Sequence, residues 1–319
     1  MKKIKVGVVG VGYLGRFHAE KYSNIPEAEL VGVVDIDKGA ADETASRFNT
    51  KAYYDYRDLI GRVDAVSIVV PTHLHHAIAK AFINNKIDCL IEKPITATIE
   101  EADDLIELSD KNGVLLQVGH LERFNPAILA LGSNVDDPMF IESDRLAPFN
   151  IRGTEVCVVL DLMIHDIDII LNFVNADVKK IDAVGVPVIS REVDIANARI
   201  EFVNGCVANV TASRISREKL RKMRIFQHDS YISIDYIQPK ITVLKKNMKE
   251  GSIIPEIFED NITMEKGDAL MSEIKAFVNS VASRKSPIVT GRDGKRALEV
   301  AIKIKECLNK TGKKTGYGL

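Results

Sequence analysis

An apolar segment that runs directly into closely spaced glycines limits how this chain can fold more than any other feature. The segment begins at Ile4 and enters the pattern Gly10-x-Gly12-x-x-Gly15. Gly10 allows a tight turn, Gly12 leaves room for a pyrophosphate near the backbone, and Gly15 lets the next helix pack closely on the strand. The positive end of that helix then faces the phosphates. The pattern predicts a strand, turn and helix that bind a dinucleotide, with contacts from the turn that include Tyr13 and Leu14.

An acidic residue ends the next apolar run. Leu30–Val34 is followed by Asp35, and its carboxylate is expected to accept hydrogen bonds from the hydroxyls of the adenosine ribose. An ordinary glycine-rich turn would give no account of Asp35. The negative charge also disfavours a 2′-phosphate, and Asp37 adds to this repulsion, so the sequence predicts NAD rather than NADP.

Composition narrows the class of protein. The 319 residues suffice for two domains. A net charge of −2 gives no reason to expect nucleic acid or a membrane surface as a partner. The basic start of the chain enters a strand pattern and is not typical of a signal peptide. Four scattered cysteines without metal-ligand spacing favour free thiols in a reducing cytosol, and hence a cytoplasmic protein: Cys89, Cys157, Cys206 and Cys307.

Strand and helix patterns divide the chain near residue 120. Residues 1–120 alternate between the two, which predicts an α/β domain with a doubly wound parallel Rossmann sheet. The expected strands are Lys5–Val9, Leu30–Val34, Ala65–Val70, Cys89–Ile91 and Val114–Val118. Helices are expected to start near Tyr13, Lys38, His73 and Thr98, the last with a capping box to Glu101 and a left-handed end at Gly113.

Residues 121–319 predict a second domain of α+β type with a large, open, mostly antiparallel sheet. Residues 121–175 have a helical pattern interrupted by a strand at Met139–Leu146. Period-two strands follow at Ala196–Val203, Val207–Ser213, Met223–Gln227 and Tyr231–Tyr236, with a hairpin turn at Asn204-Gly205. Two helices close the chain, Asp268–Ser283 and Asp293–Asn309, the second capped by Asp293. The last helix is also expected to be able to pack near the first domain.

Two segments that could carry chemistry follow parallel strands, where open α/β sheets bind their ligands. The first contains Pro71, Thr72, His73 and His76. Its closely spaced histidines lack an acidic or cysteine partner at a normal ligand spacing, so we expect no metal. The second is Glu92-Lys93-Pro94, in which the proline restricts the backbone of Lys93 and so directs its side chain. A solvated Glu-Lys pair in a loop is the alternative.

A third segment joins a carboxylate to an imidazole. On a helix, Asp161 and His165 are four residues apart and share a face, so the carboxylate can orient the ring and raise its basicity. The surrounding positions are apolar, and buried polar pairs gather at active sites. The alternative is a structural histidine that is hydrogen-bonded to Asp161 in the core.

These segments together resemble the glucose–fructose oxidoreductase/inositol dehydrogenase family (Gfo/Idh/MocA) over nearly the whole chain. The matching motifs are Gly10-x-Gly12-x-x-Gly15-x-x-His18, Pro71-Thr-x-x-His, Glu92-Lys93-Pro94, Asp161-x-x-x-His165 and the ending that begins at Pro287. The resemblance implies an NAD-dependent enzyme that oxidises a sugar or cyclitol hydroxyl. It implies that His165 is the general acid/base, Asp161 its partner, and Lys93 the contact to the reacting hydroxyl. It also implies contacts to the cofactor from Pro71, Thr72, His73, His76, Glu92 and Lys93. Arg123 and Asn125, just past the domain junction, are expected to contact cofactor or substrate.

A narrower resemblance is to the members of this family that oxidise the C3 hydroxyl of UDP-N-acetylglucosamine, upstream of an aminotransferase. It rests on the segments 118–126, 159–168 and 213–231. A basic run supplies a physical reason, because clustered cations can bind a diphosphate: Arg214, Arg217, Lys219, Arg221, Lys222 and Arg224. A solvated loop between strands is the alternative. Arg152, Arg214, Lys219 and Arg221 are the substrate contacts expected here, together with Lys93, Asn125, Asp161 and His165.

Rival functions stay open at this point. They are an inositol or other non-nucleotide sugar dehydrogenase, an NAD-dependent glycosidase, and a redox sensor. The complete set of Lys93, Asp161 and His165 argues against a pure sensor. Apolar residues alternate on both faces of the predicted sheet between Ala196 and Tyr236, so a homodimer or homotetramer formed through that sheet is expected.

Overall fold

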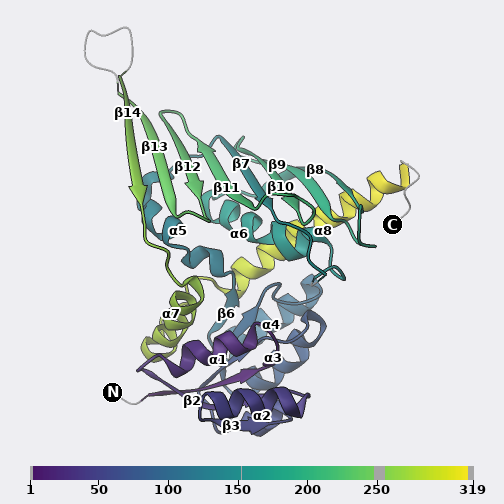
Figure 1. The fold of residues 1–319 in the computed structure, drawn as a ribbon, viewed down its shortest axis with the longest axis vertical. Coiled ribbons are helices and arrows are strands. Elements are labelled where there is room, and N and C mark those ends of the chain that lie inside the picture. Colours follow the sequence, from purple (N-terminus) through teal and green to yellow (C-terminus); the bar gives the residue numbers. More distant parts are fainter. Residues whose placement is uncertain (1–2, 152, 248–255, 315–319) are drawn as a thin grey trace. The chain divides into compact units, whose positions relative to one another are not determined.

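The computed structural model describes residues 3–151, 153–247 and 256–314 (Figure 1). The chain forms two compact units. The first contains residues 1–124 and 268–295, and the second contains residues 125–267 and 296–319. The expected boundary at residue 120 placed everything after it in one domain, whereas the structure returns Asp268–Lys295 to the first unit.

A parallel sheet of six strands forms the centre of the first unit, in the order β3-β2-β1-β4-β5-β6. The reversal of strand order beside β1 produces the crevice in which doubly wound sheets bind ligands. β4, β5 and β6 are fully buried and β1 is mostly so, as expected for strands covered on both faces, whereas the edge strand β3 is not buried. They are β1 (Ile4–Val9), β2 (Ala28–Val34), β3 (Lys51–Tyr53), β4 (Ala65–Ile68), β5 (Asp88–Glu92) and β6 (Leu116–Gly119).

Helices cover this sheet. Side chains of α1, α2 and α7 share one apolar cluster with β1, whereas α3 and α4 pack against each other. These helices are α1 (Gly15–Ser23), α2 (Lys38–Arg47), α3 (His75–Asn84), α4 (Ile99–Asn112) and α7 (Ala269–Ser283). The short 3-10 turns of the described chain are Tyr56–Leu59, Thr72–Leu74, Leu121–Phe124 and Gly132–Asn134.

Local side-chain chemistry sets several helix ends. Thr98 and Glu101 form the predicted capping box at the start of α4, and Gly113 ends the helix with φ of +64°. The predicted cap at Asp293 is wrong by three residues. Thr290 precedes α8 (Gly291–Lys314) and its Oγ1 accepts a hydrogen bond from the Asp293 N–H, while the Asp293 carboxylate accepts one from the Thr290 N–H.

The second unit is built on an eight-stranded sheet in the order β14-β13-β12-β11-β7-β10-β9-β8. The β7–β10 pair is parallel and the other pairs are antiparallel. Figure 1 shows α5, α6 and α8 on one side of this sheet. The strands are β7 (Phe140–Leu146), β8 (Val178–Val186), β9 (Ile195–Phe202), β10 (Val207–Ser213), β11 (Leu220–Phe226), β12 (Ser230–Asp235), β13 (Lys240–Asn247) and β14 (Glu256–Thr263).

The face toward the helices holds the core of this unit. Residues of the strands pack there with α5 (Pro126–Leu131), α6 (Ile164–Phe173) and the part of α8 that belongs to the unit. A buried ion pair crosses this core, because Arg145 Nε lies 2.6 Å from Asp166 Oδ2 and both side chains are 2% exposed. The pair fixes the first turn of α6 against β7, since a buried charge is stable only with its partner in place.

The opposite face of this sheet corrects one prediction. It is not generally apolar, since Arg224 lies 3.1 Å from Glu142 and Arg199 lies 3.6 Å from Glu201 across this surface. An apolar row remains at one end of the strands, where Phe140, Phe226 and Tyr231 stack across β7, β11 and β12. This row and the partly buried Leu146–Leu220 pair on the same face support the expectation of an apolar outer face in part.

Candidate active site

The glycine-rich turn after β1 borders a cavity of about 630 Å³ in the first unit. A Cβ atom on Gly10 would lie 2.3 Å from the carbonyl oxygen of Val69, and one on Gly15 would lie 1.8 Å from that of Gly10. Both positions therefore require glycine. A Cβ atom on Gly12 would meet no other atom within 4 Å, so open space lies beside this residue. The turn thus has the close packing and the free backbone approach that a dinucleotide pyrophosphate needs.

Asp35 lines the same cavity at the end of β2. Its Oδ2 accepts a hydrogen bond of 2.8 Å from the Val11 N–H, and its Oδ1 accepts one of 3.0 Å from the Asp37 N–H. A carboxylate has about four lone-pair positions. Asp35 can therefore hold the glycine turn in place and still accept hydrogen bonds from ribose hydroxyls. Asp37 has a different role, because it caps α2 by accepting a hydrogen bond of 2.9 Å from the Gly39 N–H.

Tyr13 and Leu14 lie between Gly12 and Gly15. Tyr13 is 55% exposed, and its ring contacts Phe17 edge-on at 5.4 Å between centroids. Leu14 is the residue before α1 and has helical backbone angles. Both therefore lie on the turn itself, where the sequence placed them.

The residues of the histidine-rich segment after β4 lie in different surroundings. Pro71 lines the cavity, and His73 is exposed beyond it. His76 turns to α4, where its Nε2 lies 2.6 Å from Asp104 Oδ2. This contact joins α3 to α4, and the expected contact of His76 to the cofactor stays a prediction. Thr72 begins the short 3-10 turn between these residues.

His75 closes the Pro71-Thr-x-x-His motif but was not predicted as a site residue, and it is buried between two loops. Its ring nitrogens lie 2.8 Å from the Val70 carbonyl oxygen and 3.0 Å from that of Pro94. Burial lowers the pKa of His75, and the two carbonyl oxygens offset this only in part. The neutral ring donates to one carbonyl at a time and holds the segment after β4 next to the segment after β5. The match to Pro71-Thr-x-x-His was the available signal.

Glu92 is a structural carboxylate at the end of β5. It is 5% exposed, and its Oε1 lies 3.2 Å from Nε2 of the fully buried His18. Burial opposes ionisation, but the hydrogen bond from His18 and the charges of His18 and Lys93 hold the pKa of Glu92 below its usual value. A Cβ atom on Gly119 would lie 2.9 Å from this carboxyl group, which explains the glycine there. The structure shows Glu92 anchoring the loop through His18, and its expected contact to the cofactor stays a prediction.

Lys93 follows this anchored carboxylate. Its N–H donates a hydrogen bond of 3.1 Å to Glu92 Oε2, and its peptide bond to Pro94 is cis. The side chain is half-buried. Lys93 therefore lies directly after a buried strand, and its backbone is held by the anchored carboxylate of Glu92.

Asp161 lies directly before α6, and His165 lies in the first turn of this helix, in the second unit. The helical prediction needs one correction, because Val159–Met163 is a π-helical turn and α6 begins at Ile164. Such turns are frequent at functional sites. The Asp161 side chain is 32% exposed and His165 is half-buried. Both are accessible enough for chemistry, although most of the helix around them is buried.

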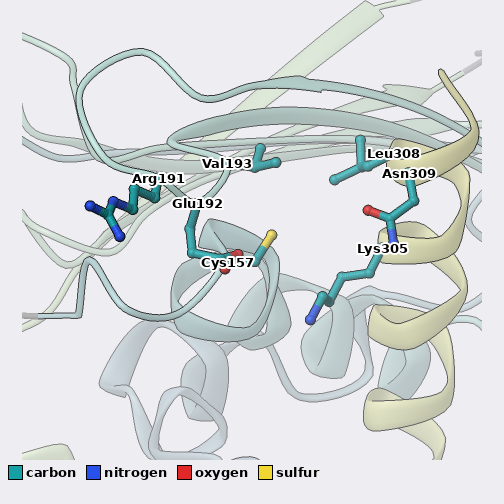
Figure 2. A pocket seen from close by; sticks show the side chains of 7 residues that line it. All are labelled: Cys157, Arg191, Glu192, Val193, Lys305, Leu308 and Asn309. Carbon is teal, nitrogen blue, oxygen red and sulfur yellow. The ribbon is translucent and has the colours of Figure 1, made fainter. Parts of the chain in front are cut away.

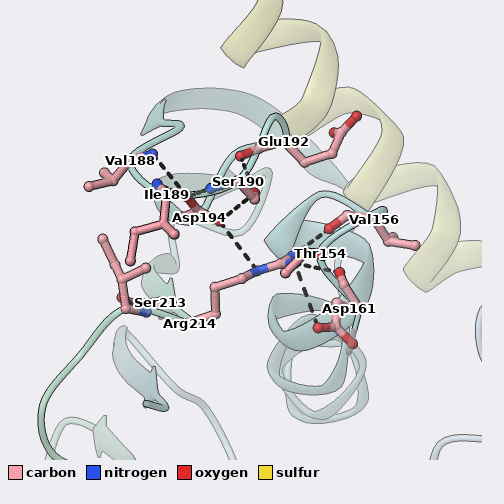
Figure 3. A network of polar contacts seen from close by, with 12 residues as sticks. Thr154, Val156, Asp161, Val188, Ile189, Ser190, Glu192, Asp194, Ser213 and Arg214 are labelled. Atoms are coloured by element: carbon pink, nitrogen blue, oxygen red, sulfur yellow. Dashed lines mark hydrogen bonds and ion pairs between the residues drawn. The ribbon is translucent and has the colours of Figure 1, made fainter. Parts of the chain in front are cut away.

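The predicted basic run is split by the structure. Arg214 is buried, Arg217 and Lys219 are exposed in the loop before β11, and Arg221 is half-buried on the core face opposite Arg145. Lys222 and Arg224 lie on the outer face, where they pair with carboxylates. The prediction of Arg214 as a diphosphate ligand is not supported, because its guanidinium is occupied by groups of the protein (Figure 3).

The residues near the unit boundary also have structural partners. Arg123 is 7% exposed, and its Nη2 lies 3.9 Å from Asp293 Oδ1. The side chain of Asn125 caps α5 by accepting a hydrogen bond of 3.0 Å from the Ala127 N–H. The expected contacts of Arg123 and Asn125 to cofactor or substrate stay predictions. Arg152 lies outside the described residues.

A second cavity, of about 400 Å³, lies in the second unit beside the start of the π-helical turn (Figure 2). Cys157, Glu192 and Lys305 contribute to its wall, and Figure 2 shows the Arg191 guanidinium pointing away from the other side chains. Burial raises the pKa of the Cys157 thiol. This cavity was not predicted, and its lining provides no set of converging groups comparable to the first cavity.

The described part of the chain shows neither a cluster of metal ligands nor a helix suited to a membrane. Its residues contain no group of three or more His, Cys, Asp or Glu side chains that could hold a metal ion. No described helix combines the length and the apolar character that crossing a membrane would require.

Comparison with known proteins defines the class. Residues 4–120 match the model of an oxidoreductase family with an NAD-binding Rossmann fold, and residues 139–232 match the GFO/IDH/MocA C-terminal domain. The chain is 38% identical to UDP-N-acetylglucosamine 3-dehydrogenase of Acidithiobacillus ferrooxidans, over 96% of this chain and 97% of the relative. The first unit is thus an NAD-binding Rossmann domain, and the protein belongs to the GFO/IDH/MocA family of oxidoreductases.

Two other similarities bear on the substrate and the fold. The chain is 30% identical to scyllo-inositol 2-dehydrogenase (NAD(+)) of Bacillus subtilis, over 94% of this chain and 92% of the relative. A solved structure of the Acidithiobacillus ferrooxidans enzyme superposes with a TM-score of 0.90 and covers 97% of this chain and 98% of that one. The predicted combination of a Rossmann sheet with a large, mostly antiparallel sheet is therefore confirmed.

Proposed function

We propose that this protein oxidises the C3 hydroxyl of UDP-N-acetylglucosamine to a ketone with NAD. The observation that carries the proposal is the 38% identity to an enzyme of that activity over almost the whole chain. The presence of Lys93, Asp161 and His165 at the matching motifs supports it. In this proposal the first unit binds NAD and the second supplies most contacts to the sugar nucleotide.

Three side chains of this protein perform the chemistry. His165 takes the proton of the hydroxyl, and Asp161 orients the ring and stabilises the imidazolium that forms. Lys93 donates a hydrogen bond to the same oxygen and stabilises the negative charge that develops on it. NAD would supply the hydride acceptor, and Gly12 and Asp35 would hold its pyrophosphate and its adenosine ribose. The cavity beside these two residues fits such a ligand.

Cationic side chains can bind the diphosphate of the substrate only if solvent, and hence the substrate, can reach them. Arg217 and Lys219 meet this condition because they are exposed in the loop between β10 and β11. Arg221 follows them at the start of β11 and is half-buried. Charge-assisted hydrogen bonds from such side chains bind phosphates strongly. We therefore assign the UDP contact to these three residues and not to Arg214.

An inositol is the second candidate substrate. The 30% identity to an NAD-dependent scyllo-inositol dehydrogenase supports it, as does the shared chemistry of a ring carrying secondary hydroxyls. The two candidates differ in what the basic loop does, because an inositol carries no phosphate. Replacing Arg217 and Lys219 by Ala should raise KM for a UDP-sugar and leave KM for an inositol unchanged.

We also propose a cytoplasmic homo-oligomer that supplies its keto sugar to an aminotransferase. The four cysteines are free, and three of them are buried, which suits a reducing compartment. The half-buried aromatic row of Phe140, Phe226 and Tyr231 is an apolar surface that could contact a second copy in a dimer or a tetramer. Light scattering of the purified protein tests the oligomeric state.

A direct assay tests the function. The purified protein is mixed with NAD and UDP-N-acetylglucosamine, and NADH is followed by absorbance with a carbonyl trap present. The proposal predicts trap-dependent NADH formation with this substrate and none with free N-acetylglucosamine. Turnover with scyllo-inositol instead would favour the second candidate.

A further inference from the structure

Arg214 joins segments that are far apart in the sequence of the second unit (Figure 3). It follows the last residue of β10 and is 4% exposed. Its Nη1 donates a hydrogen bond to the carbonyl oxygen of Gly153, and its Nη2 donates one to that of Val156. A buried guanidinium that is held in this way has little freedom to move, because each contact restricts a different part of its planar fork.

Asp194 anchors the other side of the Arg214 side chain. Its Oδ1 lies 3.9 Å from Arg214 Nε, and its carbonyl oxygen accepts a hydrogen bond of 2.9 Å from the Arg214 N–H. The Asp194 carboxylate also accepts hydrogen bonds from the N–H groups of Val188, Ile189 and Ser190. Burial opposes ionisation, but the Ser190 hydroxyl and these N–H groups lower the pKa of Asp194 to about 2. Asp194 is therefore a permanent negative charge beside Arg214 at neutral pH.

Asp161 lies at the free end of this arrangement. Its Oδ2 is 4.0 Å from Arg214 Nη2. A Cβ atom on Gly153 would lie 3.0 Å from the same oxygen, and Gly153 has φ of +81°, so this glycine packs directly against the carboxylate. Arg214 thus contacts Asp161 by charge and also holds the Gly153–Val156 segment that packs against it.

We propose that Arg214 is a positioning residue that sets the orientation of the Asp161 carboxylate for catalysis. The inference rests on the proposed function, in which Asp161 orients His165. The π-helical turn makes such support necessary, since Asp161 lies in an irregular turn and not in a regular α-helix. Arg214 acts through Asp161 and does not contact the substrate. Lysine cannot replace it, because one ammonium group cannot reach two carbonyl oxygens and two carboxylates in the same geometry.

A double-mutant cycle tests this role. kcat and KM are measured with NAD and UDP-N-acetylglucosamine for the wild type, Arg214→Lys, Asp161→Asn and the double variant. We expect Arg214→Lys to lower kcat roughly 10- to 100-fold, with each KM changed by less than about threefold, because small misplacements of catalytic groups carry such costs. In the Asp161→Asn background the same change should lower kcat by less than about threefold.

Arg224→Lys is the matched control. Arg224 also lies near two carboxylates, those of Glu142 and Asp144, but on the outer face of the sheet. The Arg224→Lys variant should therefore leave kcat unchanged. Gly153→Ala is a second variant, because its Cβ would lie 3.0 Å from the Asp161 carboxylate and its φ of +81° disfavours any side chain, and it should lower kcat in the same range. It keeps the test informative if Arg214→Lys does not fold.

The outcomes separate this inference from the proposed function. Equal losses from Arg214→Lys with and without Asp161 would contradict the inference, as would a rise in KM for the sugar nucleotide at unchanged kcat. Full turnover by Asp161→Asn would reject the catalytic assignment itself and the inference with it. A crystal structure of Arg214→Lys needs no substrate. A displaced Asp161 carboxylate supports positioning even if UDP-N-acetylglucosamine is not turned over, and an unmoved one overturns it.

Discussion

The segment after β5 and the π-helical turn before α6 each hold a carboxylate beside a residue that we assign to catalysis, but they hold it differently. Glu92 is 5% exposed and lies 3.2 Å from the buried His18. The Asp161 side chain is 32% exposed and lies 4.0 Å from Arg214. The first carboxylate is locked inside the fold, whereas the second remains accessible and is supported from behind.

This difference teaches what each carboxylate can do. A fully buried charge with a fixed partner stabilises a loop but cannot take part in a reaction that needs contact with substrate. A partly exposed carboxylate can do so, provided that other groups keep it oriented. Glu92 therefore serves the placement of Lys93, and Asp161 is suited to serve a reacting imidazole.

The largest effect is expected from removing the groups that act on the reacting hydroxyl. If turnover survives their removal, the comparison between the two carboxylates no longer holds. His165→Ala and Lys93→Ala should each lower turnover by about 10²- to 10⁴-fold, since each removes a group that acts on the reacting hydroxyl. NAD binding, followed by fluorescence titration, should stay nearly normal. The rate of NADH formation is the measurement, and near-normal turnover by both variants would show that the catalytic assignment is wrong.

Removing His18 should mainly affect stability. His18→Leu leaves the Glu92 carboxylate buried without its imidazole partner, which is expected to lower the free energy of unfolding by about 3 kcal/mol. Urea denaturation of the full protein measures this loss in the free energy of unfolding. The double variant His18→Leu/Glu92→Gln should recover part of this loss, because it no longer buries a charge. An unchanged urea midpoint for His18→Leu would mean that Glu92 is not locked by this contact.

Acid should weaken the support behind Asp161. The pKa of Asp194 is lowered to about 2 in the folded protein, below the ordinary value of 3.8 for this side chain. Its ionised form therefore stabilises the fold by about 2 kcal/mol above roughly pH 4, and this contribution is lost as the pH falls toward 2. Asp194→Asn should be less stable than the wild type near neutral pH by about that amount, and the difference should shrink on acidification. A pH-independent difference in urea midpoints would contradict this assignment.

The smallest effect is expected on the outer face of the second sheet. Arg224→Met removes ion pairs to Glu142 and Asp144 at partly exposed side chains. Exposed pairs of this kind contribute about 0–1 kcal/mol. Thermal unfolding should therefore differ little from the wild type, in contrast to His18→Leu. A loss as large as that of His18→Leu would show that this surface is more buried than the single chain indicates.

Much of the fold could be predicted from local sequence patterns. The buried strands of the first sheet and the ends of α4 follow from apolar runs and capping residues, and the Asn204-Gly205 turn joins β9 and β10 as predicted. β3 was missed because it has three residues, and β14 because nearly all of its residues are exposed and show no alternation. The π-helical turn at Val159–Met163 was read as a regular helix, since its apolar pattern resembles one.

The candidate site was less predictable where distant segments meet. The motifs gave Lys93, Asp161 and His165 from residue type and spacing. The roles of Arg214 and His18 depend on contacts with residues such as Asp194 and Glu92, which are far away or in other elements. A basic run therefore indicated a diphosphate site at Arg214, whereas the fold turned this side chain inward. The direction of the Arg214 side chain depends on its partners in the loop before β9 and in the Gly153–Val156 segment.

The most direct test of the central claim is NADH formation by the purified protein with NAD, UDP-N-acetylglucosamine and a carbonyl trap. Our account predicts trap-dependent NADH formation that is absent with free N-acetylglucosamine and is lost in His165→Ala. NADH formation that persists in His165→Ala, or that requires scyllo-inositol instead of the nucleotide sugar, would contradict it.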